Sequence, residues 1–552
     1  MWGFSARTVR FASLAGLGFV ALSEAPSAFA QSEPAALERT IPQPDAQTQS
    51  NPSISGPRRA KSARLSAPKS FVLGAVNIQG ARTFTREELS RYFEPMLARE
   101  INGAKLGELA ARITQRYRDS GYVLSYASIP SQNVEAGIVS LAVTEGRIAR
   151  VTVDGAGSER STIEAIADPL LRDAPLKDAT LERVVGLIRD LPGISVTDVS
   201  LARTDADAGL YGLKIKVARN PVKLFTYMDN RGAESIGRIR LYSSVSLTSL
   251  AMGGDELRFD LFGIPGHGSR YLYGQVMASA PIGHNGLRVT LAASKGDQNL
   301  RPSERIDGDS RNFSAQLSYP MIRGRSLTMV GKASLNDWRS AANDHGVPRL
   351  RDRLRVARIG IEFSTETRTR LRGDFTLSTG LDFDGATKAG DPLASRPRAG
   401  SQFLKGAFNL RITQPLADRL RLQTAIAGQY SSRSLLSYEE FAVGGSQIGR
   451  AFDYNEITGD HGIAGVVELA YRLGDAKGLI KKPELFAYVD GGATFRKHPT
   501  PDFPKKEWLA GTGVGVRFGV GGFTLSSEVG VPVVRSNGHR SVRTFFSISR
   551  AL

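Results

Sequence analysis

The chain lacks cysteine, has few histidines, and contains no long apolar run beyond its N-terminus. Without cysteine, its 552 residues can form neither a disulfide framework nor a thiolate metal site. The six histidines show no paired metal-ligand spacing and no His-Glu-x-x-His motif. After the N-terminus no stretch reaches the roughly 18 to 20 apolar residues that a membrane helix requires. We therefore expect no metal and no cofactor, and any crossing of a membrane would use strands.

The N-terminus has the pattern of an export signal. Arg7 and Arg10 precede an apolar run over residues 11–23, and a small-x-small sequence ends at Ala30. This arrangement predicts a secretory signal peptide over residues 1–30, cleaved between Ala30 and Gln31, because the apolar run is too short for a membrane anchor. Residues 31–70 are rich in proline, serine and glutamine, which is typical of a linker, and residues 34–40 have the composition of a short helix.

The formal net charge of +18 bears on the partners. Such a charge ordinarily favours nucleic acid. Export argues against that partner, and the basic residues are dispersed through segments that look like strands. Anionic lipid, lipopolysaccharide or a charged pore lining suits this distribution better.

The order strand, helix, helix, strand, strand occurs twice, over residues 71–148 and 149–220. The first strand of each copy ends at a glycine after a polar residue, Gly80 and Gly155. In the first copy, Thr85 and Glu88 have the spacing of a capping box and predict a helix that runs through Arg99. We interpret the pattern as an internal duplication of a small α+β unit.

From residue 221 to 552 apolar and polar residues alternate in long segments, as in FSAQLSY at 313–319. A soluble β-sandwich and an outer-membrane barrel both produce this alternation. Segments of about ten residues match tilted spanning strands better than ordinary strands. Together with the export signal, this length predicts an all-β transmembrane barrel of about 16 antiparallel strands, preceded by the two α+β units.

Residues 121–155, GYVLSYASIPSQNVEAGIVSLAVTEGRIARVTVDG, resemble the first POTRA domain of the two-partner secretion transporters (the TpsB family, hemolysin secretion and activation proteins), and LPGISV at 191–196 is similar to the second. The resemblance implies two periplasmic POTRA domains and an outer-membrane barrel. It implies a β-rich, TpsA-like partner polypeptide, received unfolded by strand addition at the POTRA edges and secreted through the pore. It also implies contact with the barrel assembly machinery during biogenesis.

The family carries a Val-Arg-Gly-Tyr/Phe signature at the tip of a loop that folds back into the lumen. The matching residues are Gly449, Arg450, Ala451 and Phe452. Arginine and the aromatic residue are kept, whereas Ala451 stands where the family has glycine. Because alanine disfavours positive φ, this departure bears on the backbone conformation of the tip.

The second family signature matches residues 488–492, YVDGG. Alternation predicts that Tyr488, Asp490 and Gly492 face the lumen, with Gly492 leaving room for the loop. A guanidinium suits one carboxylate through two parallel hydrogen bonds. We therefore expect an Arg450–Asp490 pair that holds the loop, with Glu468 as another inward carboxylate.

Several other interpretations remain open from the sequence. Arg450 could be a solvated loop residue, and the α+β units could be rigid spacers. An assembly factor that inserts barrels would usually carry more than two POTRA domains, and a passive porin would need none. A phospholipase built on a barrel needs a Ser/His pair that the sequence does not place. The glycines of residues 511–515 resemble half a nucleotide loop, but no helix follows them, which favours a glycine patch of the barrel. We predict a protein that is not an enzyme.

Overall fold

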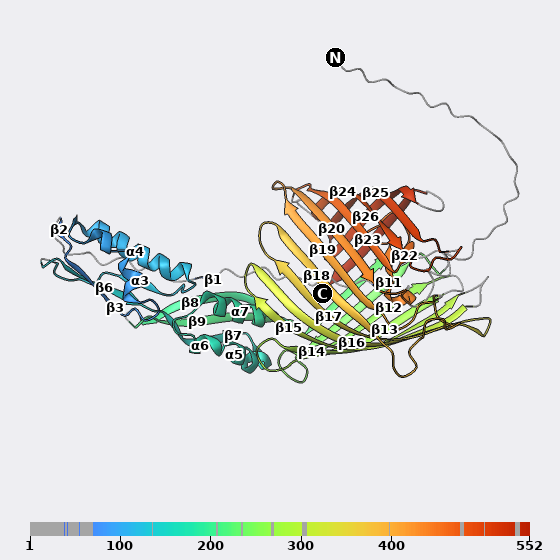
Figure 1. The fold of residues 1–552 in the computed structure, drawn as a ribbon, viewed down its shortest axis with the longest axis horizontal. Helices are drawn as coiled ribbons and strands as arrows, with labels where there is room; N and C mark the ends of the chain where they lie inside the picture. Colours follow the sequence, from blue (N-terminus) through green and yellow to red (C-terminus); the bar gives the residue numbers. More distant parts are fainter. Residues whose placement is uncertain are drawn as a thin grey trace, which may run out of the picture.

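The computed structural model describes residues 38, 41, 54–55, 70–134, 136–205, 208–232, 236–266, 270–300, 306–396, 398–474, 480–501, 503–535 and 541–552. Two small α+β units lie end to end beside one end of a closed β-barrel (Figure 1). We call the barrel end next to these units proximal and the other end distal. The predicted signal peptide, with its cleavage site between Ala30 and Gln31, lies outside the described residues, as does most of the predicted linker. No described helix is long and apolar enough to span a membrane.

The first unit is a three-stranded sheet in the order β3-β6-β5 with two helices. Helix α4 turns one face inward because its apolar residues recur at helical spacing, and Leu106, Leu109, Ile113 and Tyr117 are buried on that face. Strand β5 forms one edge of the sheet. The elements of this unit are β2 (Phe71–Val72), β3 (Ala75–Gln79), α3 (Arg86–Ser90), β4 (Glu100–Ile101), α4 (Gly103–Asp119), β5 (Tyr126–Ser128) and β6 (Ile138–Thr144).

Helix α3 has the predicted start but not the predicted end. The Thr85 side chain accepts a hydrogen bond from the Glu88 backbone N–H, and the Glu88 carboxylate accepts one from the Thr85 N–H, so the capping box is present. The helix nevertheless ends at Ser90 rather than Arg99, and a 3₁₀ turn over Glu94–Met96 follows. Pro95 lies in this turn and explains the early end, because proline has no backbone N–H and disfavours a helical residue before it.

The second unit repeats this element order. Its first strand begins at Arg147, two residues before the boundary expected at residue 149. Its sheet has the order β1-β8-β9-β7, in which β1 belongs to the predicted linker and pairs parallel with β8. That part of the linker is therefore a strand. The elements are β1 (Ile54–Ser55), β7 (Arg147–Asp154), α5 (Arg160–Ala167), α6 (Pro169–Arg172), α7 (Asp178–Arg189), β8 (Ile194–Asp205) and β9 (Leu210–Arg219).

Gly80 and Gly155 occupy equivalent positions in the two α+β units, which supports the internal duplication. Both have φ +81°. A Cβ on Gly80 would lie 2.3 Å from the Val143 carbonyl oxygen, and a Cβ on Gly155 would lie 2.2 Å from the Val217 carbonyl oxygen. Only glycine fits either position, because both the backbone angle and the close approach exclude a side chain.

Sixteen strands close into an antiparallel barrel, as the alternation predicts. Their outward residues are largely apolar and exposed, for example Leu291, Phe313, Leu335, Ile359 and Val489. The strands are β10 (Val222–Asp229), β11 (Arg240–Thr248), β12 (Glu256–Pro265), β13 (Arg270–Pro281), β14 (Arg288–Leu300), β15 (Ile306–Arg323), β16 (Leu327–Asp344), β17 (Val347–Thr365), β18 (Arg370–Leu381), β19 (Leu404–Pro415), β20 (Leu420–Ser431), β23 (His461–Arg472), β24 (Ile480–Phe495), β25 (Lys506–Val520), β26 (Phe523–Arg535) and β27 (Arg543–Ala551).

The barrel closes at a short seam between β10 and β27. These strands pair over five residue positions, from Phe225 with Ala551 to Asp229 with Ser547. By contrast, β15, β16 and β17 have 18 to 19 residues and pair along nearly their whole length. The seam therefore has the shortest paired register of any two neighbouring strands in the barrel.

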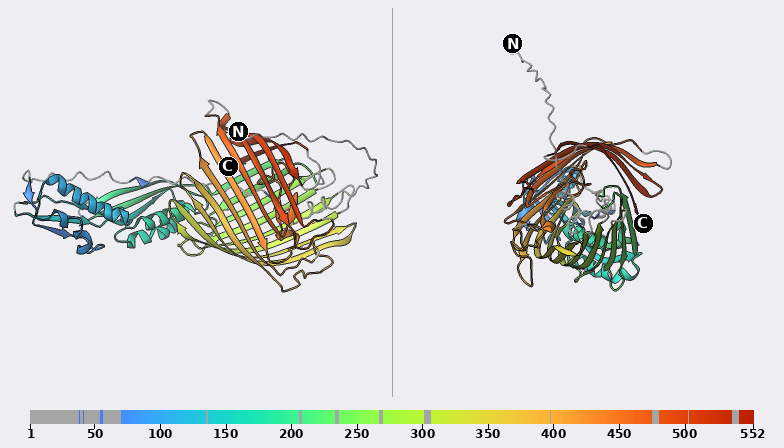
Figure 2. Two further views of the ribbon diagram at one scale, coloured as in Figure 1. Left: turned by 45° about the horizontal axis from the view of Figure 1, so that its top comes forward. Right: turned by 90° about the vertical axis from the view of Figure 1, so that its right-hand side faces the viewer.

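Helix α7 attaches the second unit to the proximal end of the barrel (Figure 2). The Asp190 carboxylate accepts hydrogen bonds from Arg323 Nε at 2.7 Å and from Nη2 at 2.8 Å, beside the turn that joins β15 and β16. Arg183 donates to the Pro320 carbonyl oxygen at 2.9 Å and to the Tyr319 hydroxyl at 3.1 Å. These contacts place the α+β units at the end where the first barrel strand begins.

Candidate functional site

The connection between β20 and β23, residues 432–460, folds back inside the barrel, and we call it the lumen loop. It contains a short hairpin of β21 (Phe441–Val443) and β22 (Ile457–Gly459), whose strands are joined by GGSQIGRAFDYNE at 444–456. A turn at its tip is closed by a hydrogen bond from the Phe452 N–H to the Gly449 carbonyl oxygen at 3.0 Å. The positive φ of this turn falls on Gly449, at +79°, and Ala451 does not adopt one. The departure from the family's glycine therefore introduces no backbone strain at Ala451.

Arg450 is buried and its guanidinium lies between two carboxylates. It donates from Nη1 to Glu468 Oε2 at 2.5 Å and from Nη2 to Glu528, which lies on β26. The guanidinium carbon also lies 3.8 Å from the centre of the Tyr488 ring. A planar cation thus has charge partners at its edge and an aromatic ring on its face, which are the two contacts that arginine makes best. Arg450 is not a solvated loop residue.

Asp490 contacts the loop, but not in the predicted way. Its Oδ2 accepts hydrogen bonds from the backbone N–H groups of Gly449 and Arg450, both at 2.8 Å. The expected pair between the Arg450 guanidinium and Asp490 is therefore wrong, because that guanidinium is taken by Glu468 and Glu528. Asp490 instead fixes the backbone of the tip, and the positive φ of Gly449 allows two consecutive N–H groups to converge on one oxygen.

Glycines on the barrel wall make room for the loop, although Gly492 is not among them. A Cβ on Gly492 would lie 2.6 Å from the Ala464 Cβ on the neighbouring strand β23, so this glycine serves the packing of the wall. The loop rests instead on two other glycines: Cβ atoms on Gly511 and Gly530 would lie 3.0 and 3.2 Å from the Ala451 Cβ. Phe452 is buried in the same contact and packs with Leu509, Ala464, Val443 and Ile457.

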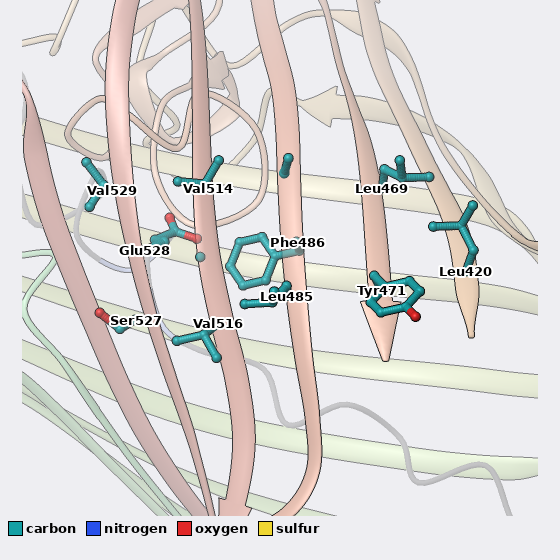
Figure 3. A pocket seen from close by; sticks show the side chains of 12 residues that line it. Leu420, Leu469, Tyr471, Leu485, Phe486, Val514, Val516, Ser527, Glu528 and Val529 are labelled. Atoms are coloured by element: carbon teal, nitrogen blue, oxygen red, sulfur yellow. The ribbon is translucent and has the colours of Figure 1, made fainter. Parts of the chain in front are cut away.

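The glycine patch at residues 511–515 on β25 also makes room for aromatic rings of the neighbouring strand β24. Cβ atoms on Gly513 and Gly515 would lie 2.5 Å from the Tyr488 hydroxyl and 2.3 Å from the Phe486 ring, so the large rings of β24 lean across β25. Tyr488 can therefore lie flat beneath Arg450. Figure 3 shows Phe486 and Glu528 on the two strands that flank β25. The same two side chains line a cavity of about 590 Å³, whose other walls are mostly apolar residues of the barrel surface together with Ser527.

The sequence did not reveal Glu528 or Arg231 as members of the site. Arg231, just after β10, donates to the Arg450 carbonyl oxygen at 2.9 Å and also pairs with Glu528. Arg517 donates to both oxygens of Glu468, at 2.8 and 2.7 Å. We call these residues with Arg450 the Arg450 cluster. The alternation of residues 523–535 indicates that Glu528 faces inward. No sequence motif, however, relates Glu528 to Arg450.

A second group of contacts joins the lumen loop to the first strands and the last strand of the barrel. Arg240 on β11 pairs with the buried Asp229 and donates to the Tyr454 hydroxyl at 2.8 Å. Asp453 pairs with Arg543 on β27 at 2.7 Å. Residues 453 and 454 therefore contact both sides of the β10–β27 seam.

Part of the N-terminal segment lies inside the barrel too. Glu38 accepts a hydrogen bond from Trp338 Nε1 at 3.2 Å and another from the Ser310 hydroxyl. Ile41 packs beside a cluster that includes Tyr242 and Phe262. Glu38 is helical, in agreement with a short helix over residues 34–40, whose other members lie outside the described residues.

A serine–histidine contact occurs at the distal end of the barrel. Ser434 Oγ lies 2.6 Å from His498 Nδ1. The serine is buried, and among the described residues no carboxylate contacts the histidine ring to orient it. A hydrolytic triad needs such an orienting group and a reachable serine, so the described geometry does not form one.

Comparisons with known proteins agree with this architecture. The family described as haemolysin secretion/activation protein ShlB/FhaC/HecB matches residues 213–518, and the ShlB-type POTRA domain matches residues 71–146. The chain is 24% identical over 492 residues to the outer membrane transporter CdiB of Dickeya dadantii, covering 87% of this chain and 86% of that protein. It is 24% identical over 452 residues to the heme/hemopexin transporter protein HuxB of Haemophilus influenzae, covering 79% of each.

A solved structure shows the same fold. CdiB from Escherichia coli superimposes with a TM-score of 0.74 at 20% sequence identity, covering 95% of this chain and 98% of that chain. The distal end is thus the cell-surface end of an outer-membrane barrel, and the two α+β units are POTRA domains in the periplasm. This chain belongs to the ShlB/FhaC/HecB family of haemolysin secretion/activation proteins, which are outer-membrane transporters.

Proposed function

We propose that this protein receives one unfolded, β-rich exoprotein at its POTRA domains and secretes it through the barrel, and that the Arg450 cluster holds the pore in its resting state. The observation that carries the proposal is a charged loop tip bound inside a lumen that must conduct a chain. An extended polypeptide cannot share the lumen with a docked loop, so the loop must leave its site during transport.

The chemistry of the Arg450 cluster suits a contact that opens. Ion pairs that become buried lose their hydration, which offsets much of their mutual attraction. When the whole loop leaves, both its cation and the wall carboxylates regain water together. A well-packed apolar contact of the same size would have no such compensation. The Arg450 cluster can therefore fix the docked position of the lumen loop without making its release very unfavourable.

The first POTRA domain offers an edge for strand addition. Strand β5 is an edge of its sheet, and α4 packs beside it. An added strand would gain backbone hydrogen bonds from β5, which provide affinity. Its side-chain contacts with the helix would provide specificity. Folding of the exoprotein outside the cell would make its return unfavourable because apolar surface becomes buried there.

The described N-terminal residues support a second obstruction of the pore. The contacts of Glu38 with Ser310 and Trp338 place this segment against the inner wall of β15 and β16. We infer that Glu38 and Ile41 lie in the lumen at rest and are displaced when the exoprotein passes.

The decisive experiment compares secretion of the partner exoprotein by the intact transporter and by Arg450→Ala and Arg450→Lys. Correct folding of each barrel is confirmed first by heat-modifiable gel mobility. We expect Arg450→Ala to leave the exoprotein in the periplasm, because a loop that cannot dock deprives the pore of the resting state from which transport starts. Arg450→Lys should rescue only in part, because an ammonium cannot bridge two carboxylates and lie flat on Tyr488. Normal secretion by a folded Arg450→Ala barrel would remove the role proposed for the cluster.

Alternative functions give different results in the same strain. An assembly factor predicts loss of other outer-membrane barrels when the gene is deleted, with secretion unaffected. A porin predicts steady solute flux that does not depend on the POTRA domains. An enzyme predicts esterase activity that is lost in Ser434→Ala. We expect none of these three outcomes.

A further inference from the structure

Four basic residues form one row across four neighbouring strands of the barrel, near its cell-surface end. Lys295 on β14 is the direct partner of Arg311 on β15, Arg311 is the partner of Arg339 on β16, and Arg339 is the partner of Arg353 on β17. We call these residues the cation row. Neighbouring strands lie about 4.8 Å apart, so the row spans about 14 Å perpendicular to the strands and runs obliquely around the barrel because its strands are tilted.

The cation row faces away from the lumen. Trp338 and Leu354 pack with Leu435 and Leu436 of the lumen loop, so both point inward. Because successive side chains of a strand point to opposite faces, the adjacent Arg339 and Arg353 point outward. The buried Ser310 hydrogen-bonds to Glu38 in the lumen, which likewise turns Arg311 outward. All four cations are exposed.

The row lies where the apolar band of the barrel ends. Toward the periplasm, the next outward positions on β15, β16 and β17 hold Phe313 and the Asp337–Arg355 ion pair. Below them lie Leu291, Leu335 and Ile359, of which Ile359 is 62% exposed. Toward the cell surface, the next outward positions are Asp297, Asp309 and Arg351. The row is therefore at the level of the polar head groups of the outer leaflet.

The protein neutralises this row only in part. Arg311 has Asp309 at 3.8 Å, and Arg339 has Asp337 at 2.9 Å. Over the described ranges, Lys295 and Arg353 form no ion pair. Like charges directly opposite each other on neighbouring strands repel and destabilise a sheet. A run of four such positions therefore favours an external anion that bridges them.

We propose that the cation row binds the phosphate groups of lipopolysaccharide in the outer leaflet. The three arginines can each donate two parallel hydrogen bonds to a phosphate, and Lys295 adds a point charge at the end of the row. The acyl chains of the same lipid would lie on Phe313, directly below Arg311, and on Leu291 and Leu335, two outward positions below Lys295 and Arg339. In this lipid the phosphates lie nearer the cell surface than the acyl chains. The basic and apolar residues of the barrel surface follow the same order.

The test uses the full chain purified in detergent micelles and titrated with fluorescent lipid A that carries two phosphates. A fourfold variant, Lys295→Gln, Arg311→Gln, Arg339→Gln and Arg353→Gln, removes the row. The matched control, Arg86→Gln, Arg91→Gln, Lys105→Gln and Arg112→Gln, removes four exposed charges from the first POTRA domain. Heat-modifiable gel mobility confirms that each barrel is folded, and the four single variants replace the fourfold one if it does not fold.

We expect each single substitution to weaken binding about fivefold, since one basic residue near a membrane surface contributes about 1 kcal/mol. The fourfold variant should lose most of the affinity, and the control none. Dephosphorylated lipid A should bind the intact chain as weakly as phosphorylated lipid A binds the fourfold variant. Equal binding of both lipids, or equal binding by the fourfold variant, would overturn the proposal. Displacement of lipid A by millimolar inorganic phosphate would also overturn it, because the row would then bind free phosphate. Unchanged lipid binding with loss of exoprotein from the cell surface would assign the row to a protein partner instead.

Discussion

At the scale of single residues, the Arg450 cluster is a chain of alternating charges in the order Arg517, Glu468, Arg450, Glu528, Arg231. Removing the central arginine leaves two intact ion pairs, so no buried charge is orphaned. Removing Glu528 leaves Arg231 without its carboxylate, while Arg450 and Arg517 still share Glu468. The two kinds of substitution should therefore differ in their effect on the stability of the barrel.

Glu528→Ala is expected to destabilise the barrel more than Arg450→Ala does. The variant leaves Arg231 without its carboxylate in a buried site, and breaking a buried pair in this way costs about 3–5 kcal/mol. The measurement is the temperature at which the folded band disappears in heat-modifiable gel mobility. Glu362→Ala is the control, because Glu362 pairs with Lys332 at a half-exposed position. Equal transition temperatures for Glu528→Ala and Glu362→Ala would contradict the order of charges described above.

Gly530→Val is expected to push the lumen loop out of its site. A Cβ at this position would lie 2.9 Å from the Ala451 Cα and 3.1 Å from the Tyr488 hydroxyl. The loop cannot approach so closely once a side chain is present, and the conductance of single pores in planar bilayers should rise. Gly274→Val is the control, since nothing lies within 4 Å of a Cβ there. An unchanged conductance of Gly530→Val would show that the loop does not limit ion flow.

At the scale of elements, the sequence was informative wherever a local pattern decides the structure. Alternation identified the barrel, helical spacing identified α4, and the Thr85–Glu88 capping box gave the start of α3. The end of α3 differs from the prediction because Pro95 interrupts the helix despite the helical pattern of the residues before it. The partners of Arg450 could not be predicted for a different reason. Glu528 and Arg231 lie on other strands, and only closure of the barrel brings them to the loop.

Glu145 shows how one residue joins several elements of the first POTRA domain. Its carboxylate accepts hydrogen bonds from the N–H groups of Arg82 and Thr83 and from the Tyr117 hydroxyl at 2.8 Å. Burial alone would raise the pKa of Glu145, but these donors outweigh burial and lower it below its usual value of 4.5. The carboxylate therefore stabilises the domain above pH 4.5, and this stabilisation is lost as the pH falls through the lowered pKa.

Glu145→Gln should remove this part of the pH dependence. We expect faster hydrogen exchange of the first POTRA domain in the variant at neutral pH, by a factor that corresponds to about 1–3 kcal/mol, and a smaller change on acidification than in the intact chain. The exchange is measured by mass spectrometry on the full protein. Glu108→Gln, at an exposed position of α4, is the control. The interpretation fails if both variants exchange like the intact chain at neutral pH.

At the scale of the whole molecule, the lumen loop is bound to both sides of the seam that closes the barrel. Tyr454 contacts Arg240 on one side and Asp453 contacts Arg543 on the other, whereas β10 and β27 themselves share five residue pairs. The loop thus supplies side-chain contacts where backbone pairing is shortest. Displacement of the loop should weaken the closure of the barrel.

Arg240→Gln tests this link. It leaves Asp229 buried without its arginine and removes the contact with Tyr454, so we expect the folded band in gel mobility to disappear at a lower temperature. A disulfide across the seam, made by Met228→Cys and Ile548→Cys at directly paired positions, should restore the transition temperature. The cysteine-free chain gives no competing disulfide. Arg270→Gln is the control because this exposed side chain pairs with Asp297 on β14, away from the seam and the loop. Failure of a formed disulfide to restore the temperature would place the defect away from the seam.

The composition of the Arg450 cluster also sets an order of events during folding. The contact between Arg231 and Glu528 joins residues 297 positions apart in the chain. Contacts of such separation form only after the intervening chain has been brought together, because its loss of conformational freedom comes first. Glu528 belongs to the penultimate strand, so the loop cannot dock in a barrel that lacks its last strands. A docked loop thus marks a finished barrel, and an unfinished one is left with its channel unobstructed by Arg450.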